Sequence, residues 1–269
     1  MQASIDNLHA IYLALLQGLT EFLPISSSAH LVLLPKLLGW EDQGLAFDVA
    51  VHVGTLFAVT AYFRHDILRL LGAWLQSCGR WQMTADAKLV WFVILGTVPV
   101  AIAGLLFHDH IEMYLRAPLI IAATTIGFGV LLGFADLRGK KQRSENTLEF
   151  TDIVWIGLAQ ALALVPGTSR SGITMTAALA LGLTRSAAAR FSFMLSIPTI
   201  LMAGGYESLK LFQQSAPVAW DSLLLGTGVA FISAYLCIRL FMLLIERVGM
   251  LPFVIYRLGL GVFLLLLFY

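Results

Sequence analysis

Two short segments of the sequence place polar and ionisable side chains in surroundings that are otherwise apolar. Residues 21–30 read EFLPISSSAH, and residues 163–174 read ALVPGTSRSGIT. Ionisable groups at membrane depth are expensive and rare, so each of them indicates a functional site. Together the segments supply a carboxylate, an imidazole, a guanidinium and several hydroxyl groups. This set is typical of an anion-binding site for phosphoryl transfer, where catalysis is mostly positioning and charge stabilisation.

The second segment offers groups that can hold an anion. The guanidinium of Arg170 is a planar fork suited to phosphate oxygens. Gly167 lets backbone N–H groups approach, and a helix that begins near Ser171 would point its positive end at the anion. The hydroxyl groups that are candidates for binding the substrate belong to Ser26, Ser169, Ser171 and Thr174.

The first segment offers groups that can move protons and form bonds. Ser27 is a candidate nucleophile if His30 or Glu21 takes its proton. His30 can itself be a nucleophile, or a general acid or base near neutral pH. Glu21 can be a base, can orient His30, or can ligate a hard cation with Gln17, which lies four residues earlier on the same helix face. The residues alone leave the nucleophile open between Ser27 and His30.

The composition says which kind of chain must position these groups. Of 269 residues, 59% are hydrophobic and 12% are charged, and the mean hydropathy is +0.85, whereas an average soluble domain is roughly 25% charged. Lys and Arg number 17 against 16 Asp and Glu, so no basic field exists to attract DNA or RNA. A soluble enzyme, a disordered chain and a nucleic-acid binder are excluded, and an all-α polytopic membrane protein is predicted.

Hydropathy predicts six spanning helices and two broken ones. A span needs about 20 mostly apolar residues. Two further apolar regions, residues 8–38 and 153–184, are interrupted halfway by proline and a Ser/Thr cluster, which break a helix. Broken backbone is tolerated at membrane depth only inside protein or along a cavity, so both regions are predicted to be re-entrant helix hairpins. The predicted spans are residues 45–63, 89–107, 117–135, 191–206, 222–245 and 250–269.

The two halves of the chain repeat each other within one integral membrane domain, residues 1–269. The hairpin motifs lie over one another, and Phe47 to Thr55 lies over Phe191 to Thr199 at a similar offset. Each half reads hairpin and three spans, an odd number, so the second half must be inverted. The predicted boundaries are repeat one at about residues 1–136, a cytoplasmic linker at about 137–152, and repeat two at about 153–269.

Loop charge predicts the orientation in the membrane. Residues 64–88 and residues 138–143 each hold four Lys or Arg, whereas residues 108–116 hold one. The positive-inside rule places the first two segments in the cytoplasm. The first hairpin then opens outward, the second opens toward the cytoplasm, and both chain ends lie outside.

Plainer explanations exist for several of these residues. Serine and threonine at a helix break often only satisfy backbone groups or allow close packing, and Glu21 with Arg170 can form a purely structural ion pair. Asp48 and His52 lie four residues apart on one face of an apolar span, where they either line the cavity or pack near the outer interface.

Two further arginines and two glycine pairs have structural explanations that involve no catalysis. Arg190 and Arg257 are expected to extend their charged ends to the membrane interfaces. The G-x-G pairs at residues 127–129 and 259–261 permit helix packing within the chain or between two chains, so a homodimer is compatible with the sequence.

At these motifs the sequence resembles the bacterial undecaprenyl-diphosphatase family, integral membrane enzymes linked to bacitracin resistance. The likeness covers essentially the whole chain, with both motifs in order. Gln17 stands where many relatives carry glutamate. Because an amide cannot be a base, Glu21 and His30 become the main candidates for that role. The matching positions are Gln17 and Glu21 of E/Q-x-x-x-E, Pro24, Ser26, Ser27 and His30 of P-x-S-S-x-x-H, and Pro166, Gly167, Ser169, Arg170, Ser171 and Thr174 of P-G-x-S-R-S-x-x-T.

The resemblance implies hydrolysis of undecaprenyl diphosphate to undecaprenyl phosphate and inorganic phosphate. This reaction recycles the lipid carrier for peptidoglycan and other envelope polymers and confers bacitracin resistance. It also implies assistance by a divalent cation, Mg²⁺ or Ca²⁺, expected near Glu21 and Gln17, in a bacterial inner-membrane protein whose active site faces the periplasm. The alternative function is a lipid flippase or secondary transporter, since inverted repeats with broken helices are a transporter architecture. A non-catalytic scaffold would tolerate the loss of Glu21 and Arg170.

Overall fold

The computed structural model describes residues 6–80, 83–115, 117–213 and 220–268, and these ranges contain helices and no strand. The first half comprises α1 (Asn7–Thr20), α2 (Ser27–Leu38), α3 (Gly44–Tyr62), α4 (Arg64–Arg80), α5 (Ala85–Tyr114) and α6 (Pro118–Arg138). The second half comprises the short turns η1 (Glu145–Thr147) and η2 (Leu162–Leu164) and the helices α7 (Phe150–Ala161), α8 (Arg170–Ala180), α9 (Arg185–Gln213), α10 (Trp220–Val248) and α11 (Leu251–Phe268).

Six of the described helices are long and apolar enough to cross a membrane, namely α3, α5, α6, α9, α10 and α11. Each contains most or all of one predicted span, so the prediction of an all-α polytopic membrane protein is confirmed. The helices run past several of the predicted ends. For example, α9 begins at Arg185, six residues before the predicted start at Phe191, because a polar first turn lowers the local hydropathy without breaking the helix.

The two predicted hairpins are present as pairs of short helices. α1 and α2 have 14 and 12 residues, and α7 and α8 have 12 and 11. At about 1.5 Å per residue none of them can cross a hydrocarbon core about 30 Å thick. The chain turns at Pro24 in the first hairpin and at Pro166 in the second, as the helix-breaking residues predict.

The residue before each second hairpin helix has an unusual backbone conformation. Ser26 has φ 77° and Ser169 has φ 69°, a region that residues other than glycine seldom adopt. Such strain persists only where the surrounding structure enforces it, and it clusters at functional sites. The two loops therefore share one geometry at matching positions of the two repeats.

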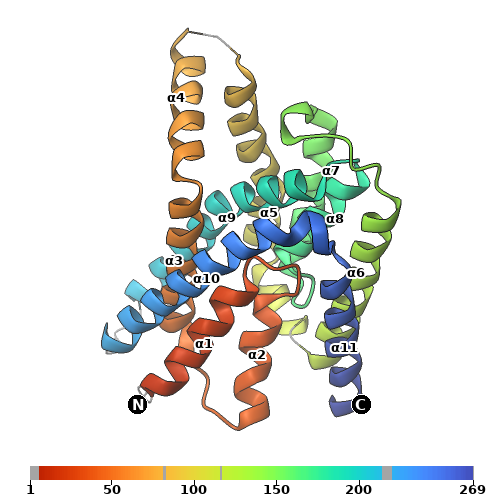
Figure 1. The fold of residues 1–269 in the computed structure, drawn as a ribbon. Helices are drawn as coiled ribbons and strands as arrows, with labels where there is room; N and C mark the ends of the chain where they lie inside the picture. Colours follow the sequence, from red (N-terminus) through yellow and green to blue (C-terminus); the bar gives the residue numbers. More distant parts are fainter. Residues whose placement is uncertain (1–5, 81–82, 116, 214–219, 269) are drawn as a thin grey trace.

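The packing of the helices also follows the repeat. α1 packs against α10, and its counterpart α7 packs against α5. The equivalent helices α3 and α9 pack against each other, as do α6 and α11. These pairings are what two structurally related halves produce when they face each other (Figure 1).

The structure differs from the prediction in one helix of the first half. Loop charge predicts a basic cytoplasmic loop at residues 64–88, but most of these residues form α4 and the start of α5, which project together from the bundle (Figure 1). α4 is amphipathic and continues the line of α3 after Phe63. A search for long apolar stretches misses such a helix because its polar face lowers its mean hydropathy. The start of α1 and the end of α11 lie at the end of the molecule opposite the end of α4 (Figure 1).

The core holds the end of α1 in place. Phe22, which directly follows Glu21, is fully buried and packs edge-to-face on Phe193 of α9, with ring centroids 5.2 Å apart. Phe193 in turn lies next to Phe63 and Phe241. This aromatic cluster fixes the backbone at Glu21 against the second repeat.

Ion pairs fasten the linker between the repeats. Arg143 forms two hydrogen bonds to Asp152 at the start of α7, at 3.2 and 2.6 Å. Arg190 pairs with Glu145 of the linker at 2.8 Å and with Asp66 of α4 at 3.2 Å. Arg190 therefore joins α9 to the linker and to α4, and its expected extension to a membrane interface stays a prediction.

Candidate active site

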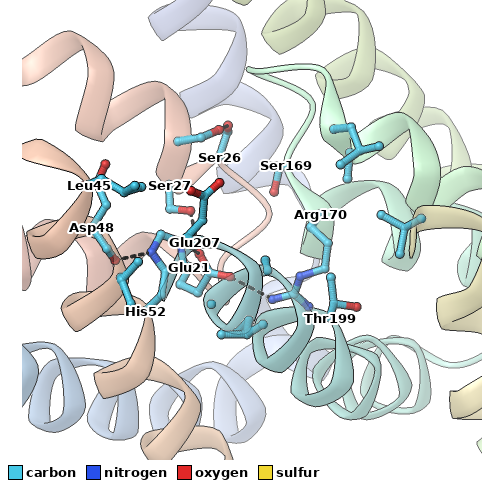
Figure 2. A pocket seen from close by; sticks show the side chains of 18 residues that line it. Glu21, Ser26, Ser27, Leu45, Asp48, His52, Ser169, Arg170, Thr199 and Glu207 are labelled. Carbon is cyan, nitrogen blue, oxygen red and sulfur yellow. Dashed lines mark hydrogen bonds and ion pairs between the residues drawn. The ribbon is translucent and has the colours of Figure 1, made fainter. Parts of the chain in front are cut away.

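A cavity of about 340 Å³ lies where the two hairpin loops meet α3 and α9 (Figure 2). Ten of its eighteen lining residues are polar, and the charged groups come from four different elements. Its polar lining residues are Glu21, Ser26, Ser27, Ser28, Asp48, His52, Ser169, Arg170, Thr199 and Glu207.

Glu21 joins the two hairpins. One carboxylate oxygen, Oε1, accepts a hydrogen bond from Arg170 Nη2 of the second hairpin at 3.0 Å. The other, Oε2, accepts from Ser27 Oγ at 2.6 Å and from Gln17 Nε2 at 3.1 Å. The sequence predicted that an acid and a guanidinium from matching loops meet at one site, and the structure brings them into direct contact.

Ser27 is placed to lose a proton. It is the first residue of α2 and lines the cavity, and its hydroxyl donates to a carboxylate at a short distance (Figure 2). A serine hydroxyl bonded to a buried carboxylate has the arrangement of a nucleophile with an adjacent base. The position at a helix N-terminus also favours negative charge on an incoming phosphate.

Arg170 occupies the matching position in the second hairpin, at the first residue of α8. Its Nη1 donates to the carbonyl oxygen of Ser192 at 3.0 Å, which leaves the guanidinium edge fixed between α9 and Glu21. Ser169 caps α8 by accepting from the N–H of Gly172 at 3.1 Å. The charged end of α8 is therefore held by contacts to α9, to Glu21 and within its own first turn.

His30 is not part of the described cavity wall. Its Nδ1 lies 2.6 Å from the carbonyl oxygen of Ser26, and its Nε2 lies 2.5 Å from the hydroxyl of Tyr256. A carbonyl can only accept, so Nδ1 carries the proton and Nε2 accepts from the tyrosine. Both ring nitrogens are thus committed to contacts that hold the first loop on α11.

Four other predicted binding residues lie behind the cavity wall. Gln17 is fully buried beneath Glu21. Ser171 donates to the carbonyl oxygen of Leu23 at 2.9 Å and ties one loop to the other. Thr174 bonds Ser192 at 2.7 Å, next to the contact of Arg170. Gly167, the fourth, has a carbonyl that accepts from Arg257. Of the predicted binding set, Ser26 and Ser169 reach the cavity.

α3 and α9 contribute three ionisable residues to the wall. Asp48 and His52 line the cavity, which decides between the two placements that the sequence left open. His52 Nδ1 lies 2.7 Å from the carbonyl oxygen of Asp48, and its Nε2 lies 3.9 Å from Glu21 Oε2. Their spacing of four residues inside an apolar span was the signal. Glu207 on α9 also lines the cavity, and no sequence pattern pointed to it.

The expectation for Arg257 is wrong. It does not extend to an interface, because its side chain is 0% exposed in the middle of the molecule. Its guanidinium donates to carbonyl oxygens of both hairpin loops, at Pro24, Gly167 and Thr168. An ionisable residue inside an apolar span was the available signal, but its partners are main-chain atoms that no sequence pattern reveals.

The oxygen atoms around Glu21 are of the chemical kind that a hard divalent cation prefers. Gln17 Oε1 is buried and has no hydrogen-bond partner, and Asp48 and Glu207 add carboxylates to the wall. Among the described residues no group of three or more His, Cys, Asp or Glu is arranged to hold a metal by itself. Amide and carboxylate oxygens suit Mg²⁺ and Ca²⁺, and phosphate oxygens commonly complete such a shell.

Known proteins resemble this chain along nearly its whole length. It is 57% identical over 263 residues to the undecaprenyl-diphosphatase of Nitrosococcus oceani, covering 98% of this chain and 99% of that protein. It is 58% identical over 265 residues to the undecaprenyl-diphosphatase of Thioalkalivibrio sulfidiphilus, covering 98% and 100%. Residues 10–263 match the family described as bacitracin resistance protein BacA. With its two hairpin motifs meeting at one cavity, the chain belongs to the bacitracin resistance protein BacA family.

Proposed function

We propose that this protein hydrolyses undecaprenyl diphosphate to undecaprenyl phosphate and inorganic phosphate. The contact that carries the proposal is Ser27 Oγ bonded to Glu21 Oε2 at 2.6 Å, with Arg170 on the other carboxylate oxygen. The relatives named undecaprenyl-diphosphatase match 98% of the chain, which favours the hydrolase over the transporter alternative. Recycling of the lipid carrier and bacitracin resistance follow from this activity.

The geometry supports a covalent route through Ser27. Its Oγ attacks the terminal phosphorus while Glu21 takes the hydroxyl proton. The bond from that phosphorus to the bridging oxygen breaks, and undecaprenyl phosphate leaves as an anion. Water then attacks the phosphoserine, the bond from phosphorus to Ser27 Oγ breaks, Ser27 regains its proton from Glu21, and inorganic phosphate departs as dihydrogen phosphate with both protons of the water. Arg170 and the first turns of α2 and α8 stabilise the phosphate charge throughout.

In this scheme His30 does not react with the substrate but holds the loop that carries Ser27. Its bonds to Ser26 and Tyr256 fix the turn that presents Ser27. These contacts support Ser27, rather than His30, as the proposed nucleophile. His30 remains important because the loop it holds is strained at Ser26.

In this proposal the cation binds together with the substrate. Gln17 and Glu21 are the protein groups that would hold Mg²⁺ or Ca²⁺, together with oxygens of the diphosphate. When bound, the cation would offset charge on a substrate that enters a cavity with three carboxylates, Glu21, Asp48 and Glu207. The expected result is loss of phosphate release in EDTA and recovery with added Mg²⁺ or Ca²⁺.

The placement in the cell is part of the proposal. The chain is a multi-pass protein of the bacterial inner membrane, with the cavity open to the periplasm, as the basic linker and α4 segment support. A homodimer is compatible with the packing, since a side chain at Gly127 of α6 or Gly259 of α11 would meet nothing within 4 Å. Cross-linking of the purified protein in detergent would show whether the dimer forms.

The decisive experiment is phosphate release from a C55 diphosphate by purified protein in detergent, where no gradient exists. The hydrolase releases phosphate, and a pure transporter does not. Rapid acid quench followed by mass mapping is expected to show phosphate on Ser27, since phosphoserine survives acid. Absence of release from a folded wild-type protein, with or without a divalent cation, would refute the proposed function.

A further inference from the structure

Arg257 of α11 contacts both hairpin loops, yet it is not among the residues that line the cavity. Its Nη1 donates to the carbonyl oxygen of Pro24 in the first loop at 3.2 Å and to that of Thr168 in the second at 2.9 Å. Its Nη2 donates to the carbonyl oxygen of Gly167 at 3.0 Å, and its Nε donates to that of Thr125 in α6 at 3.1 Å. One side chain thus joins three separate segments.

The charge of Arg257 has no acidic partner in the described part of the chain. All its hydrogen bonds go to main-chain carbonyls, and no carboxylate there lies within ion-pair distance. Burying a cation without a counter-ion is expensive, so stability alone does not explain it. The structure holds a positive charge directly beneath the two loops.

The contacts also set the direction of the loop peptides. The carbonyl and the N–H of a peptide unit point in opposite directions, so carbonyls turned toward Arg257 turn the N–H sides away from it. The loops then lead into α2 and α8, whose first N–H groups have no partners within their own helices. Those helices begin at Ser27 and Arg170, which face the cavity.

The space for the guanidinium is created by glycines on two helices. A Cβ at Gly172 of α8 would lie 3.0 Å from Arg257 Nη1. A Cβ at Gly129 of α6 would lie 3.1 Å from Arg257 Cβ. Both contacts are tighter than ordinary packing, so a side chain at either position would press on the arginine.

We propose that Arg257 is a positioning residue that holds the two hairpin loops together as one diphosphate-binding unit. Its charge is balanced when the diphosphate occupies the cavity on the other side of the loops. The inference rests on the proposed function for the identity of the ligand. According to this inference, α11 contributes to substrate binding through Arg257, although α11 itself does not line the cavity.

The test measures binding separately from turnover. Purified protein in detergent is titrated with a prenyl methylenediphosphonate, which cannot be hydrolysed, and kcat and KM are measured on the natural diphosphate. Arg257→Met is expected to weaken binding by about tenfold or more, because a charge and several charge-assisted hydrogen bonds are lost. Arg257→Lys keeps the charge and is expected to recover part of the affinity. Arg239→Met, at an exposed arginine of α10, is the matched control and is expected to bind as the wild type does.

Melting temperatures without ligand separate positioning from simple loss of the fold. If Arg257→Met does not fold, Arg257→Lys and Gly129→Ala carry the test, because a Cβ at Gly129 would press on Arg257 atoms alone, and both are expected to raise KM and lower kcat while remaining folded. Wild-type affinity and turnover in folded Arg257→Lys and Gly129→Ala would overturn the proposal. If the wild type binds the analogue but releases no phosphate from the diphosphate, the proposed function fails, while the comparison of binding between variants still decides the role of Arg257.

Discussion

At the scale of single residues, Glu21 has a structural and a chemical role at once. Its two oxygens accept from Arg170 of one hairpin and from Ser27 of the other. Removal of one partner from a buried ion pair destabilises a protein by about 3–5 kcal/mol, since the other charge is left uncompensated. A substitution that shortens the side chain at this position would therefore remove both roles at once. An isosteric substitution keeps the structural contacts and removes only the chemical role.

Glu21→Gln tests the role of the carboxylate as a base. The amide oxygen can still accept from Arg170, so the protein should fold, but an amide cannot take the proton of Ser27. Phosphate release is expected to fall by ~10²–10⁴, the range for loss of a general base. The control is Glu41→Gln, at an exposed residue of the loop before α3. Wild-type turnover in Glu21→Gln would rule out Glu21 as the base.

His30 and Tyr256 are predicted to act through the loop. Tyr256→Phe removes one hydrogen bond to His30 and is expected to lower kcat by about tenfold, in line with about 1–1.5 kcal/mol per bond. His30→Gln should cause a larger loss yet still give phosphate on Ser27 in the acid-quench experiment. In contrast, Ser27→Ala should abolish the trapped species. Phosphate mapped to His30 by a quench that preserves phosphohistidine would contradict this assignment.

At the scale of elements, the hairpin loops depend on backbone geometry that a single methyl group disturbs. Gly167 has φ +89°, and a Cβ there would lie 2.2 Å from Thr124 Oγ1 and 2.6 Å from the carbonyl oxygen of Ile121. Gly167→Ala is therefore expected to displace the second loop and remove most phosphatase activity. Gly127→Ala on α6, where a Cβ meets nothing within 4 Å, should be neutral or slightly stabilising. Equal activity of the two variants would show that the loop tolerates movement.

The elements that the sequence predicted are those with a strong local signal. Long apolar runs predicted the six spans, and proline with hydroxyl residues predicted the two hairpins. α4 was missed because an amphipathic helix beside the bundle has no long apolar run. The direction of His30 was also out of reach, since it depends on Tyr256, 226 residues away. Local chemistry predicts which residues gather, and long-range packing decides which of them face the cavity.

At the scale of the whole molecule, the linker must hold the two repeats in register so that Glu21 meets Arg170. Arg143 and Asp152 fasten the linker to the second repeat. Arg143 donates to Asp152 and to the carbonyl oxygens of Thr147 and Leu181. Asp152 also accepts from the N–H of Glu149 in a capping box at the start of α7. Their ion pair therefore links the linker to both helices of the second hairpin.

This ion pair predicts a pH dependence of stability. Burial by itself raises the pKa of Asp152, but hydrogen bonds and charge from Arg143 outweigh it and hold the pKa below the ordinary value of 3.8. A carboxyl whose folded pKa is lowered contributes stability above its unfolded pKa and loses it as the pH falls through the folded pKa. Asp152→Asn should therefore lower the melting temperature at neutral pH, with a gap to the wild type that narrows below about pH 4. The control Glu41→Gln should show the same melting temperature as the wild type over the same pH range. If the difference in melting temperature between Asp152→Asn and the wild type stays constant from neutral to acid pH, the ion pair does not contribute through its charge.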